Sequence, residues 1–343
     1  MAPNSSAPKR SRRSTGAVTL HDVAKLAGVA PITASRALNT PGQVSEEVRQ
    51  KVADAVQRTG YVPNRLAGSL ASMRSRLVAA VVPTISGPVF LETIQSLTEA
   101  LAERGYQLML GQSGYAGSRE DALLEAIIGR RPDGIVLTGI MHSAEGRRRL
   151  LACGIPVVET WDLTPTPIDM LVGFSHEEVG RSVAQLLHAK GKHKLAAVSG
   201  DDARALRRLD AYRATAQSLG LPPPAVAVVA APTTLHSGRQ ALAELLRADP
   251  TIDAVFCSSD LLALGVLTEA RVQGIQVPQP LAVVGFGNLE FAADMAPSLT
   301  TVGIKGAAIG RQAAHFIVER AEGREVAERV IDIGFTLIER ESS

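Results

Sequence analysis

Apolar and polar residues alternate at helical spacing in the segment that begins at Thr19. Thr19 is a residue type that caps a first helical turn, and Gly28 ends the apolar run. Pro31 can occupy the first turn of a second helix, where its missing amide hydrogen costs nothing. Two short helices joined through a glycine turn form a helix-turn-helix. The residues expected to face inward are Val23, Ala24, Ala27, Ala34, Ala37 and Leu38.

A third helix is predicted after Ser45, where two glutamates precede a helical run of apolar residues that Gly60 terminates. Its expected inward face is Val48, Val52, Ala55 and Val56. Residues 18–60 therefore form one small domain. Residues 61–76 combine a Pro-Asn start, small residues and arginines, and we interpret them as a hinge, leaving open a helix that forms only on DNA. Residues 1–17 are rich in Ser, Pro, Lys and Arg and predict a disordered basic tail.

Beyond Leu77, short apolar runs alternate with amphipathic stretches. The runs are LVAAVVP, YQLML, DGIVLTG, IPVVE, LAAVSG, DAVFCSSD and LAVVGFG. The stretches begin near Phe90, Ser118, His176, Arg204, Ser237 and Leu261. Strand and helix repeated in this way predict an α/β body with parallel sheets over residues 77–343. Its length exceeds one doubly wound sheet, so we expect two halves that divide near residue 175, with a ligand cleft between them.

The composition of the chain indicates what kind of partner it binds and in which cellular compartment it resides. The first 76 residues hold twelve Lys or Arg and four Asp or Glu, so they carry +8 while the whole chain carries +2. A basic head predicts a polyanionic partner. The two cysteines have neither disulfide nor metal-ligand spacing. The basic N-terminus lacks a following apolar region, and no apolar stretch approaches the ~18 residues of a membrane span. These features favour the cytoplasm and argue against secretion or membrane insertion.

The string TLHDVAKLAGVAPITASRALNTPGQVSEEVRQKVADAVQRTGYVPNRLAGSLAS resembles the DNA-binding head and hinge of the lactose/galactose (LacI) repressor family. DGIVLTG, GIPVVE, VFCSSDLLALGVL, GIQVPQPLAVVGFGN and PSLTTV resemble that family's effector-binding core, which is similar to periplasmic sugar-binding proteins. Within the family, SGYAGSRE, VVETWDLTPTPIDMLVGF and IDIGFTL resemble repressors of gluconate-utilisation genes. The resemblance implies a near-palindromic operator, a homodimer or higher homo-oligomer, and a sugar-acid effector.

The resemblance also implies a DNA-binding set. The second helix of a helix-turn-helix enters the major groove, where Arg36 can bind guanine and where Pro31 and Ile32 offer apolar contact. Leu70 matches a hinge leucine that wedges into the minor groove. The matched positions with short polar side chains, which contact phosphates, are Thr19, Thr33, Ser35 and Asn39. Tyr61 and Asn64 complete the set. Ala30 departs from the family's usual Ser and removes a helix cap.

For the effector, Arg208 matches the family's pocket arginine and would bind a carboxylate, although Arg204 and Arg207 lie close enough to leave the register open. Gly287 replaces a frequent aspartate, which suits an anionic ligand. Asp260 either pairs with Arg208, orients a ligand hydroxyl or caps a helix. The other residues matched to the cleft are Phe90, Tyr115, Trp161, Phe256, Ser259 and Asn288.

The sequence lacks the motifs typical of nucleotide binding, metal binding and catalysis. GFGNLE begins like a dinucleotide loop but lacks the final glycine, and no phosphate-binding GxxxxGK[ST] occurs. The seven histidines show no metal-ligand spacing, and no nucleophile and base are paired. We therefore expect no cofactor, no metal and no catalytic site. A sugar kinase would leave the basic head unexplained, and a transported-solute receptor would need an export signal. The sequence leaves open whether the effector is gluconate, 2-ketogluconate or another sugar acid, and whether the regulator represses or activates.

Overall fold

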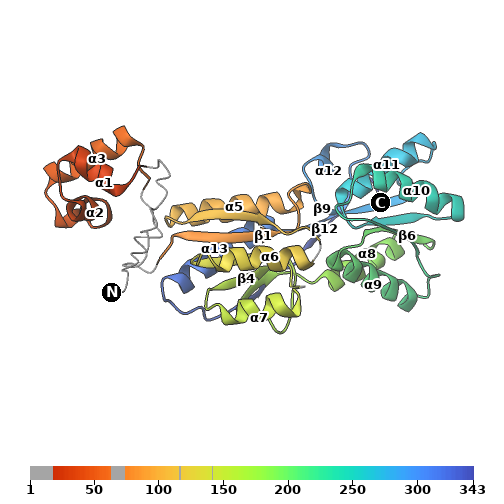
Figure 1. The fold of residues 1–343 in the computed structure, drawn as a ribbon. Coiled ribbons are helices and arrows are strands. Elements are labelled where there is room, and N and C mark those ends of the chain that lie inside the picture. Colours follow the sequence, from red (N-terminus) through yellow and green to blue (C-terminus); the bar gives the residue numbers. More distant parts are fainter. Residues whose placement is uncertain (1–17, 63–73, 116, 141) are drawn as a thin grey trace, which may run out of the picture. The chain divides into compact units, whose positions relative to one another are not determined.

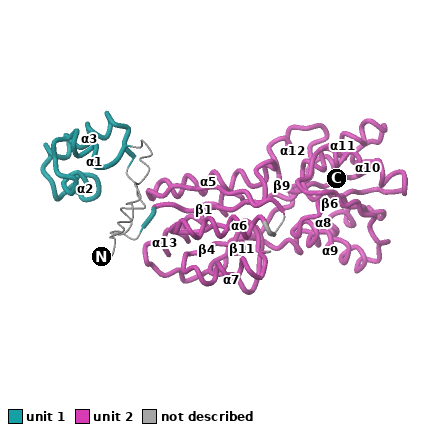
Figure 2. Tube along the Cα trace, viewed as in Figure 1, with its two compact units in different colours: residues 1–75 teal, residues 76–343 magenta. Residues whose placement is uncertain are grey.

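The computed structural model describes residues 18–62, 74–115, 117–140 and 142–343. They belong to two compact units, residues 1–75 and residues 76–343 (Figure 2). The predicted tail and most of the predicted hinge, with Asn64 and Leu70, lie outside the described residues. No helix of the described residues is long and apolar enough to span a membrane.

The described part of unit 1 is a three-helix domain built from α1 (Leu20–Ala27), α2 (Pro31–Asn39), the 3₁₀ turn η1 (Pro41–Gln43) and α3 (Glu46–Thr59). Gly28 and Gly60 end α1 and α3 in the left-handed conformation that glycine adopts without strain. The buried core consists of Val23, Ala24, Ala34, Ala37, Val52 and Ala55. These residues all belong to the predicted inward faces, so the helical spacing of the sequence determines how the three helices pack.

Unit 2 contains two lobes, each formed around a six-stranded sheet (Figure 1). The first lobe has the strand order β11-β5-β4-β3-β1-β2, and all of its strands are parallel. Its elements are β1 (Leu77–Val82), η2 (Pro88–Phe90), α5 (Leu91–Glu103), β2 (Gln107–Gln112), α6 (Gly117–Ile128), β3 (Gly134–Thr138), α7 (Ala144–Ala152), β4 (Val157–Thr160), β5 (Met170–Gly173), α13 (Gly306–Ala321) and β11 (Val330–Asp332).

The second lobe has the order β12-β10-β9-β8-β6-β7, with β12 antiparallel to β10 and the other pairs parallel. Its elements are α8 (His176–Ala189), β6 (Leu195–Gly200), α9 (Ala203–Ser218), β7 (Ala225–Val229), α10 (Leu235–Ala248), β8 (Ala254–Cys257), α11 (Asp260–Val272), β9 (Ala282–Gly287), α12 (Phe291–Asp294), β10 (Thr300–Gly303) and β12 (Thr336–Ile338).

Helices cover both faces of each sheet, which explains why the strand sequences are almost continuously apolar. In β6, Leu195 and Ala197 pack toward α8 and α9, whereas Ala196 and Val198 pack toward α10 and α11. The same alternation in β1 divides the first lobe between the pair α5 and α13 and the pair α6 and α7. The predicted α/β architecture with parallel sheets is confirmed.

The expected division near residue 175 is incomplete. The chain leaves the first lobe at Phe174, but it returns at Ile304 to form α13 and β11, and crosses again at Ile333 to form β12. Late segments of the chain thus belong to the first sheet, and three crossovers join the lobes. The cavity described below lies between the lobes at the carboxyl ends of their strands.

Candidate functional site

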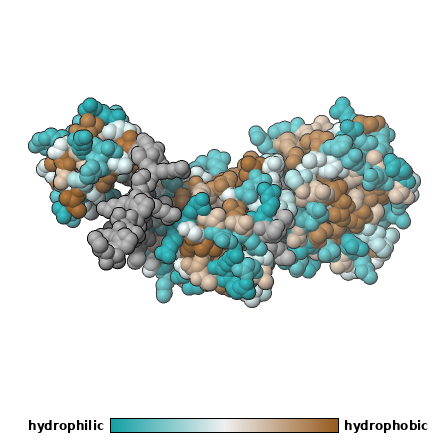
Figure 3. Space-filling model, viewed as in Figure 1, coloured by the Kyte–Doolittle hydropathy of each residue, from teal (hydrophilic) through white to brown (hydrophobic). Residues whose placement is uncertain are grey.

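The first candidate surface is the solvent-facing side of α2 in unit 1. Ala34 and Ala37 anchor the helix in the core, so its opposite side remains exposed. Ile32 is 62% exposed, and Arg36, one helical turn further on, is exposed as well. On the visible face of unit 1 in Figure 3, hydrophilic residues surround a few apolar ones. An exposed guanidinium beside an exposed aliphatic side chain can bind a polar and an apolar group at the same time.

Short polar residues border this face. Asn39 Nδ2 donates to Ser35 Oγ at 3.2 Å, which connects the two side chains along one edge of α2. Thr33 is half-buried and Pro31 is exposed at the first helical position. Ala30 supplies no side-chain cap, as the sequence predicts. Tyr61 packs partly into the core of unit 1.

Thr19 starts α1 with a capping box. Its hydroxyl accepts from the amide of Asp22 at 3.4 Å, and the Asp22 carboxylate accepts from the Thr19 amide at 2.8 Å. The Thr19 hydroxyl also donates to the Asp22 carboxylate at 2.7 Å, and this bond, followed by the bond from the Thr19 amide, lowers the pKa of Asp22 below its usual value. Thr19 is nevertheless exposed, so capping leaves it accessible to a further partner.

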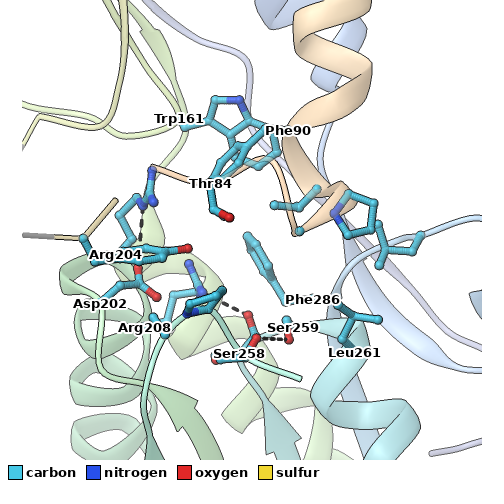
Figure 4. A pocket seen from close by; sticks show the side chains of 18 of the residues that line it. Thr84, Phe90, Trp161, Asp202, Arg204, Arg208, Ser258, Ser259, Leu261 and Phe286 are labelled. Atoms are coloured by element: carbon cyan, nitrogen blue, oxygen red, sulfur yellow. Dashed lines mark hydrogen bonds and ion pairs between the residues drawn. The ribbon is translucent and has the colours of Figure 1, made fainter. Parts of the chain in front are cut away.

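The second candidate site is a cavity between the two lobes of unit 2 (Figure 4). Thr84, Phe90 and Trp161 approach it from the first lobe, while Arg208 and Phe286 approach from the second. Each of these five residues lies at the end of a strand, in the loop after a strand, or on the helix that follows a strand. The topology of the two sheets therefore brings the residues together. The remaining lining residues that the chemistry uses are Tyr115, His176, Asp202, Arg204, Thr233, Ser258 and Ser259.

Arg208 is the charged group at the base of this cavity. It is 4% exposed, and its guanidinium lies 3.9 Å from the centre of the Phe286 ring. Nη2 donates to the Ser258 carbonyl at 3.1 Å, while Nε has no hydrogen-bond partner among the described residues. Burial lowers the pKa of Arg208 to about 10. The group is still a cation at neutral pH, and none of the described carboxylates forms an ion pair with it.

His176 orients Arg208. Arg208 Nη1 lies 2.9 Å from His176 Nδ1, and His176 Nε2 lies 2.8 Å from the Trp161 carbonyl. Because a guanidinium only donates, Nδ1 accepts and the ring hydrogen sits on Nε2, where it donates to that carbonyl. Burial first, and then the charge of Arg208, hold the pKa of His176 well below its usual value. The imidazole is neutral and does not offset the positive charge of Arg208, on which the carboxylates of Asp202 and Asp162 act only from beyond ion-pair distance.

The neighbouring arginines have different surroundings. Arg207 donates to Asp162 Oδ1 at 2.7 Å and to Glu177 Oε1 at 3.2 Å, and it does not line the cavity. Arg204 lines the cavity, with its guanidinium 5.2 Å from the centre of the Phe90 ring. Its Nε lies 3.7 Å from Asp202 Oδ1, so a carboxylate offsets part of its charge. Of the three arginines, Arg208 is the one that is both buried and lacking an acidic partner within the described chain.

Aromatic rings form one wall of the cavity. Trp161 packs edge-to-face against Phe90, with ring centres 4.9 Å apart, and against Phe174 at 5.9 Å. Its indole Nε1 donates to Thr93 Oγ1 at 3.1 Å, which fixes the ring plane. Trp161 also has a φ of 67°, a conformation that a bulky residue adopts only when its surroundings hold it there. The wall can therefore pack against the carbon face of a ligand.

Both ends of the chain match known family models. Residues 19–64 match the model for bacterial regulatory proteins of the lacI family, and residues 184–343 match a periplasmic binding protein-like domain. The HTH-type transcriptional regulator GntR of Pseudomonas aeruginosa is 36% identical over 97% of this chain and 98% of its own length. The chain belongs to the LacI family. It is a DNA-binding transcriptional regulator.

Solved structures agree with this assignment. A LacI-family transcriptional regulator from Silicibacter pomeroyi covers 95% of this chain and 99% of its own, with 32% identity and a TM-score of 0.90. The lac repressor dimer bound to operator and an anti-inducer covers 95% of this chain and 99% of its own, with a TM-score of 0.81. At 22% identity, the lac repressor shows the shared fold alone. These relatives are named as regulators rather than as enzymes.

The structure of this LacI-family chain brings together five of the eight effector residues expected from its sequence. Phe90, Tyr115, Trp161, Arg208 and Ser259 line the cavity. The other three have different surroundings. Phe256 packs against Tyr212 in the core with ring centres 5.3 Å apart, because its strand position faces the α8 and α9 layer.

Asp260 and Asn288 are engaged away from the cavity lining. Asp260 is buried at the start of α11, where its carboxylate accepts from Thr301 Oγ1 at 2.6 Å and from the Leu289 amide at 2.7 Å. Asn288 Oδ1 accepts from Arg340 Nη2 at 2.8 Å. Of the alternatives for Asp260, neither the pairing with Arg208 nor the helix cap occurs in this structure, because Ser259 caps α11, and Asn288 does not line the cavity.

Sequence reasoning did not identify several lining residues, notably His176, Asp202, Ser258 and Phe286. His176 could have been noticed because it follows a strand end, where ligand-binding groups of α/β proteins gather. Ser258 also comes directly after a strand, and Asp202 comes two residues after one. Among the described residues, no cluster of His, Cys, Asp or Glu side chains is arranged to hold a metal.

Proposed function

We propose that this regulator is a repressor of sugar-acid utilisation genes, and that a sugar acid such as gluconate releases it from its operator. The observation that carries the proposal is Arg208, a buried cation in the interlobe cavity without a carboxylate partner among the described residues. An uncompensated buried charge costs free energy unless a ligand supplies the opposite charge. A sugar-acid carboxylate would do so through paired N–H donors.

The remaining lining suits a polyol chain. Thr233 Oγ1 and Ser259 Oγ lie 2.9 Å apart, and Asp202 adds a carboxylate that accepts from hydroxyl groups. Phe90 and Trp161 provide the apolar wall that a carbon backbone requires. Gluconate has this combination of one carboxylate, several hydroxyls and no ring. The resemblance of SGYAGSRE and IDIGFTL to repressors of gluconate-utilisation genes supports the same effector.

Calorimetric titration tests the effector class. We expect gluconate or 2-ketogluconate to bind the purified protein, and glucose, which lacks the carboxylate, to bind far more weakly. A protein that binds glucose and gluconate equally would contradict the assignment of Arg208 to a carboxylate.

For DNA, we propose that α2 enters the major groove with Arg36 at a base edge and with Ile32 and Pro31 in apolar contact. Thr33, Ser35 and Asn39, which lie on α2, and Thr19, the exposed cap of α1, would contact phosphates. Tyr61, Asn64 and Leu70 remain predictions for the segment that connects the units. One head reads about half a site, so we propose a homodimer on a near-palindromic operator.

Operator footprinting tests this arrangement. We expect two protected half-sites about one helical turn apart. Protection of a single asymmetric half-site by a monomer would contradict it.

A further inference from the structure

A continuous series of hydrogen bonds leads from the cavity to the helix α13. Arg208 on α9 donates to His176, the first residue of α8, and His176 donates to the Trp161 carbonyl in the first lobe. The Trp161 indole donates to Thr93 on α5, and Thr93 Oγ1 donates to the carbonyl of Gly306 at 3.0 Å. Gly306 is the first residue of α13. All the side chains in this series are at most 6% exposed.

The series connects two of the three places where the chain crosses between the lobes. His176 follows the crossover at Phe174, and Gly306 follows the crossover at Ile304. The bond from His176 to Trp161 also joins the lobes directly, because α8 belongs to the second lobe and β4 precedes Trp161 in the first. A change at Arg208 can therefore reach residues at two of these crossovers through hydrogen bonds.

The helix α13 reaches the opposite end of the first lobe. Its 16 residues rise by roughly 24 Å at the ordinary helical rise of 1.5 Å per residue. Glu322, directly after α13, lies 3.8 Å from Arg76 Nη1 and 3.3 Å from Arg104 Nη2. Arg76 is the first residue of unit 2, where the chain arrives from the DNA-binding head.

The helices α5 and α13 are packed too tightly to slide past each other. A Cβ atom at Gly310 would lie 2.1 Å from Ser96 Oγ and 2.4 Å from the Thr93 carbonyl. Contact at that distance requires glycine, and it leaves the two helices to move together as one body.

We propose that Trp161 and Thr93 are positioning residues that transmit ligand binding at Arg208 to α13, and through α13 to Arg76. The inference rests on the proposed function, because it takes a carboxylate at Arg208 as the signal. A carboxylate that binds two guanidinium N–H groups draws Arg208 away from His176. His176 then shifts its bond to Trp161, whose backbone has a strained positive φ that a change in its surroundings can release. Because Trp161 is hydrogen-bonded to Thr93, and Thr93 to Gly306, Thr93 and the first turn of α13 then move with Trp161.

The central test measures gluconate affinity twice, on the free protein and on the operator-bound protein. Their ratio is the coupling between the sites, ordinarily about 5- to 150-fold for allosteric proteins. Thr93→Val removes the hydroxyl that joins Trp161 to Gly306 and leaves every cavity-lining residue in place. We expect the variant to bind gluconate and operator separately while the ratio falls toward one. Thr93→Ser, which keeps the hydroxyl, should restore the ratio.

Thr98→Val is the matched control. Thr98 lies on the same helix, and its hydroxyl donates only to the Ile94 carbonyl within α5. We expect this variant to keep the wild-type ratio. A wild-type ratio in Thr93→Val would overturn the proposal. If Thr93→Val does not fold, Thr93→Ala removes the same hydroxyl and is expected to lower the ratio in the same way.

A ligand-free measurement separates this proposal from the choice of effector. Hydrogen exchange in the first turn of α13 is compared for wild type, Arg208→Met, Thr93→Val and the double variant. A connected series predicts that the two changes are not additive, because either one interrupts the same path. Failure of gluconate to bind would remove the proposed effector alone, whereas strictly additive effects on exchange at α13 would remove the series itself.

Discussion

At the scale of single residues, arginines in different surroundings have different expected roles. Arg36 is exposed on α2, where it can reach a base, whereas Arg208 is buried in the cavity. Arg207, next to Arg208 in the chain, pairs with Asp162 and Glu177. The difference arises because successive residues of a helix point in different directions.

Arg36→Ala tests the DNA-binding face. Loss of a bidentate contact to guanine should weaken operator binding by ~1–3 kcal/mol and relax the base preference at one position. Competition binding against operators with single base changes measures both effects. Arg49→Ala on α3 is the control, since Arg49 pairs with Glu46 on its own helix. Unchanged selectivity in Arg36→Ala would place another face in the groove.

His142 predicts a pH dependence of stability. Its Nδ1 lies 2.5 Å from Glu120 and its Nε2 lies 3.3 Å from Glu159. Burial lowers the pKa of His142, but the two glutamates outweigh burial and raise the pKa to about 9. Because the folded pKa exceeds the unfolded value of about 6.5, this stabilisation is complete below pH ~6.5 and is lost as the pH rises through about 9.

Thermal unfolding between pH 6 and 10 measures this effect. The difference in midpoint between wild type and His142→Gln should shrink as the pH rises. A difference that stays constant across that range would show that His142 is not charged in the folded protein.

At the scale of elements, α2 is the one helix among those described in unit 1 that starts without a side-chain cap. Ala30 has the extended backbone of a cap residue but no side chain that can accept a hydrogen bond. Ala30→Ser should therefore stabilise α2 by about 1 kcal/mol and slow hydrogen exchange of its amides roughly fivefold. The exchange of α3 amides, whose helix already has the Ser45 cap, serves as the internal reference. Faster exchange in α2 would contradict the prediction.

Helical spacing and turn residues were sufficient to predict α1, α2 and α3 of unit 1 and seven of the strands in unit 2. They were insufficient for β5, β7, β10, β11 and β12. Met170–Gly173 is short and follows a loop, while Thr300–Gly303 and Thr336–Ile338 contain threonines that weaken the apolar signal. The return of α13 and β11 to the first sheet depends on contacts between residues distant in sequence, which no local pattern contains.

Residues of the interlobe cavity could be predicted only where the sequence resembles motifs of the family. Arg208, Trp161 and Phe90 were found from the resemblance. Asp260 shows the limit, because its residue type permits a ligand contact, a salt bridge or a cap, and only the tertiary structure reveals its bonds to Thr301 and Leu289. His176 gains its role from two partners, Arg208 and Trp161, that lie 32 and 15 residues away in the chain.

At the scale of the whole molecule, the proposed function requires that a ligand in unit 2 changes DNA binding by unit 1. A ligand achieves this only if it binds one arrangement of the protein more tightly than the other. We expect the lobes to close around a sugar acid and operator affinity to fall, with a coupling of ~1–3 kcal/mol. The crossovers beside His176 and Gly306 are where such closure would be accommodated.

The central claim is tested most directly by operator affinity with and without gluconate, measured for wild type, Arg208→Met and Arg213→Met. Arg213 is exposed on the same helix and serves as the control. We predict that all three proteins bind operator, that gluconate releases wild type and Arg213→Met, and that Arg208→Met stays bound. Full release of Arg208→Met by gluconate, or tighter operator binding by wild type when gluconate is added, would contradict the account.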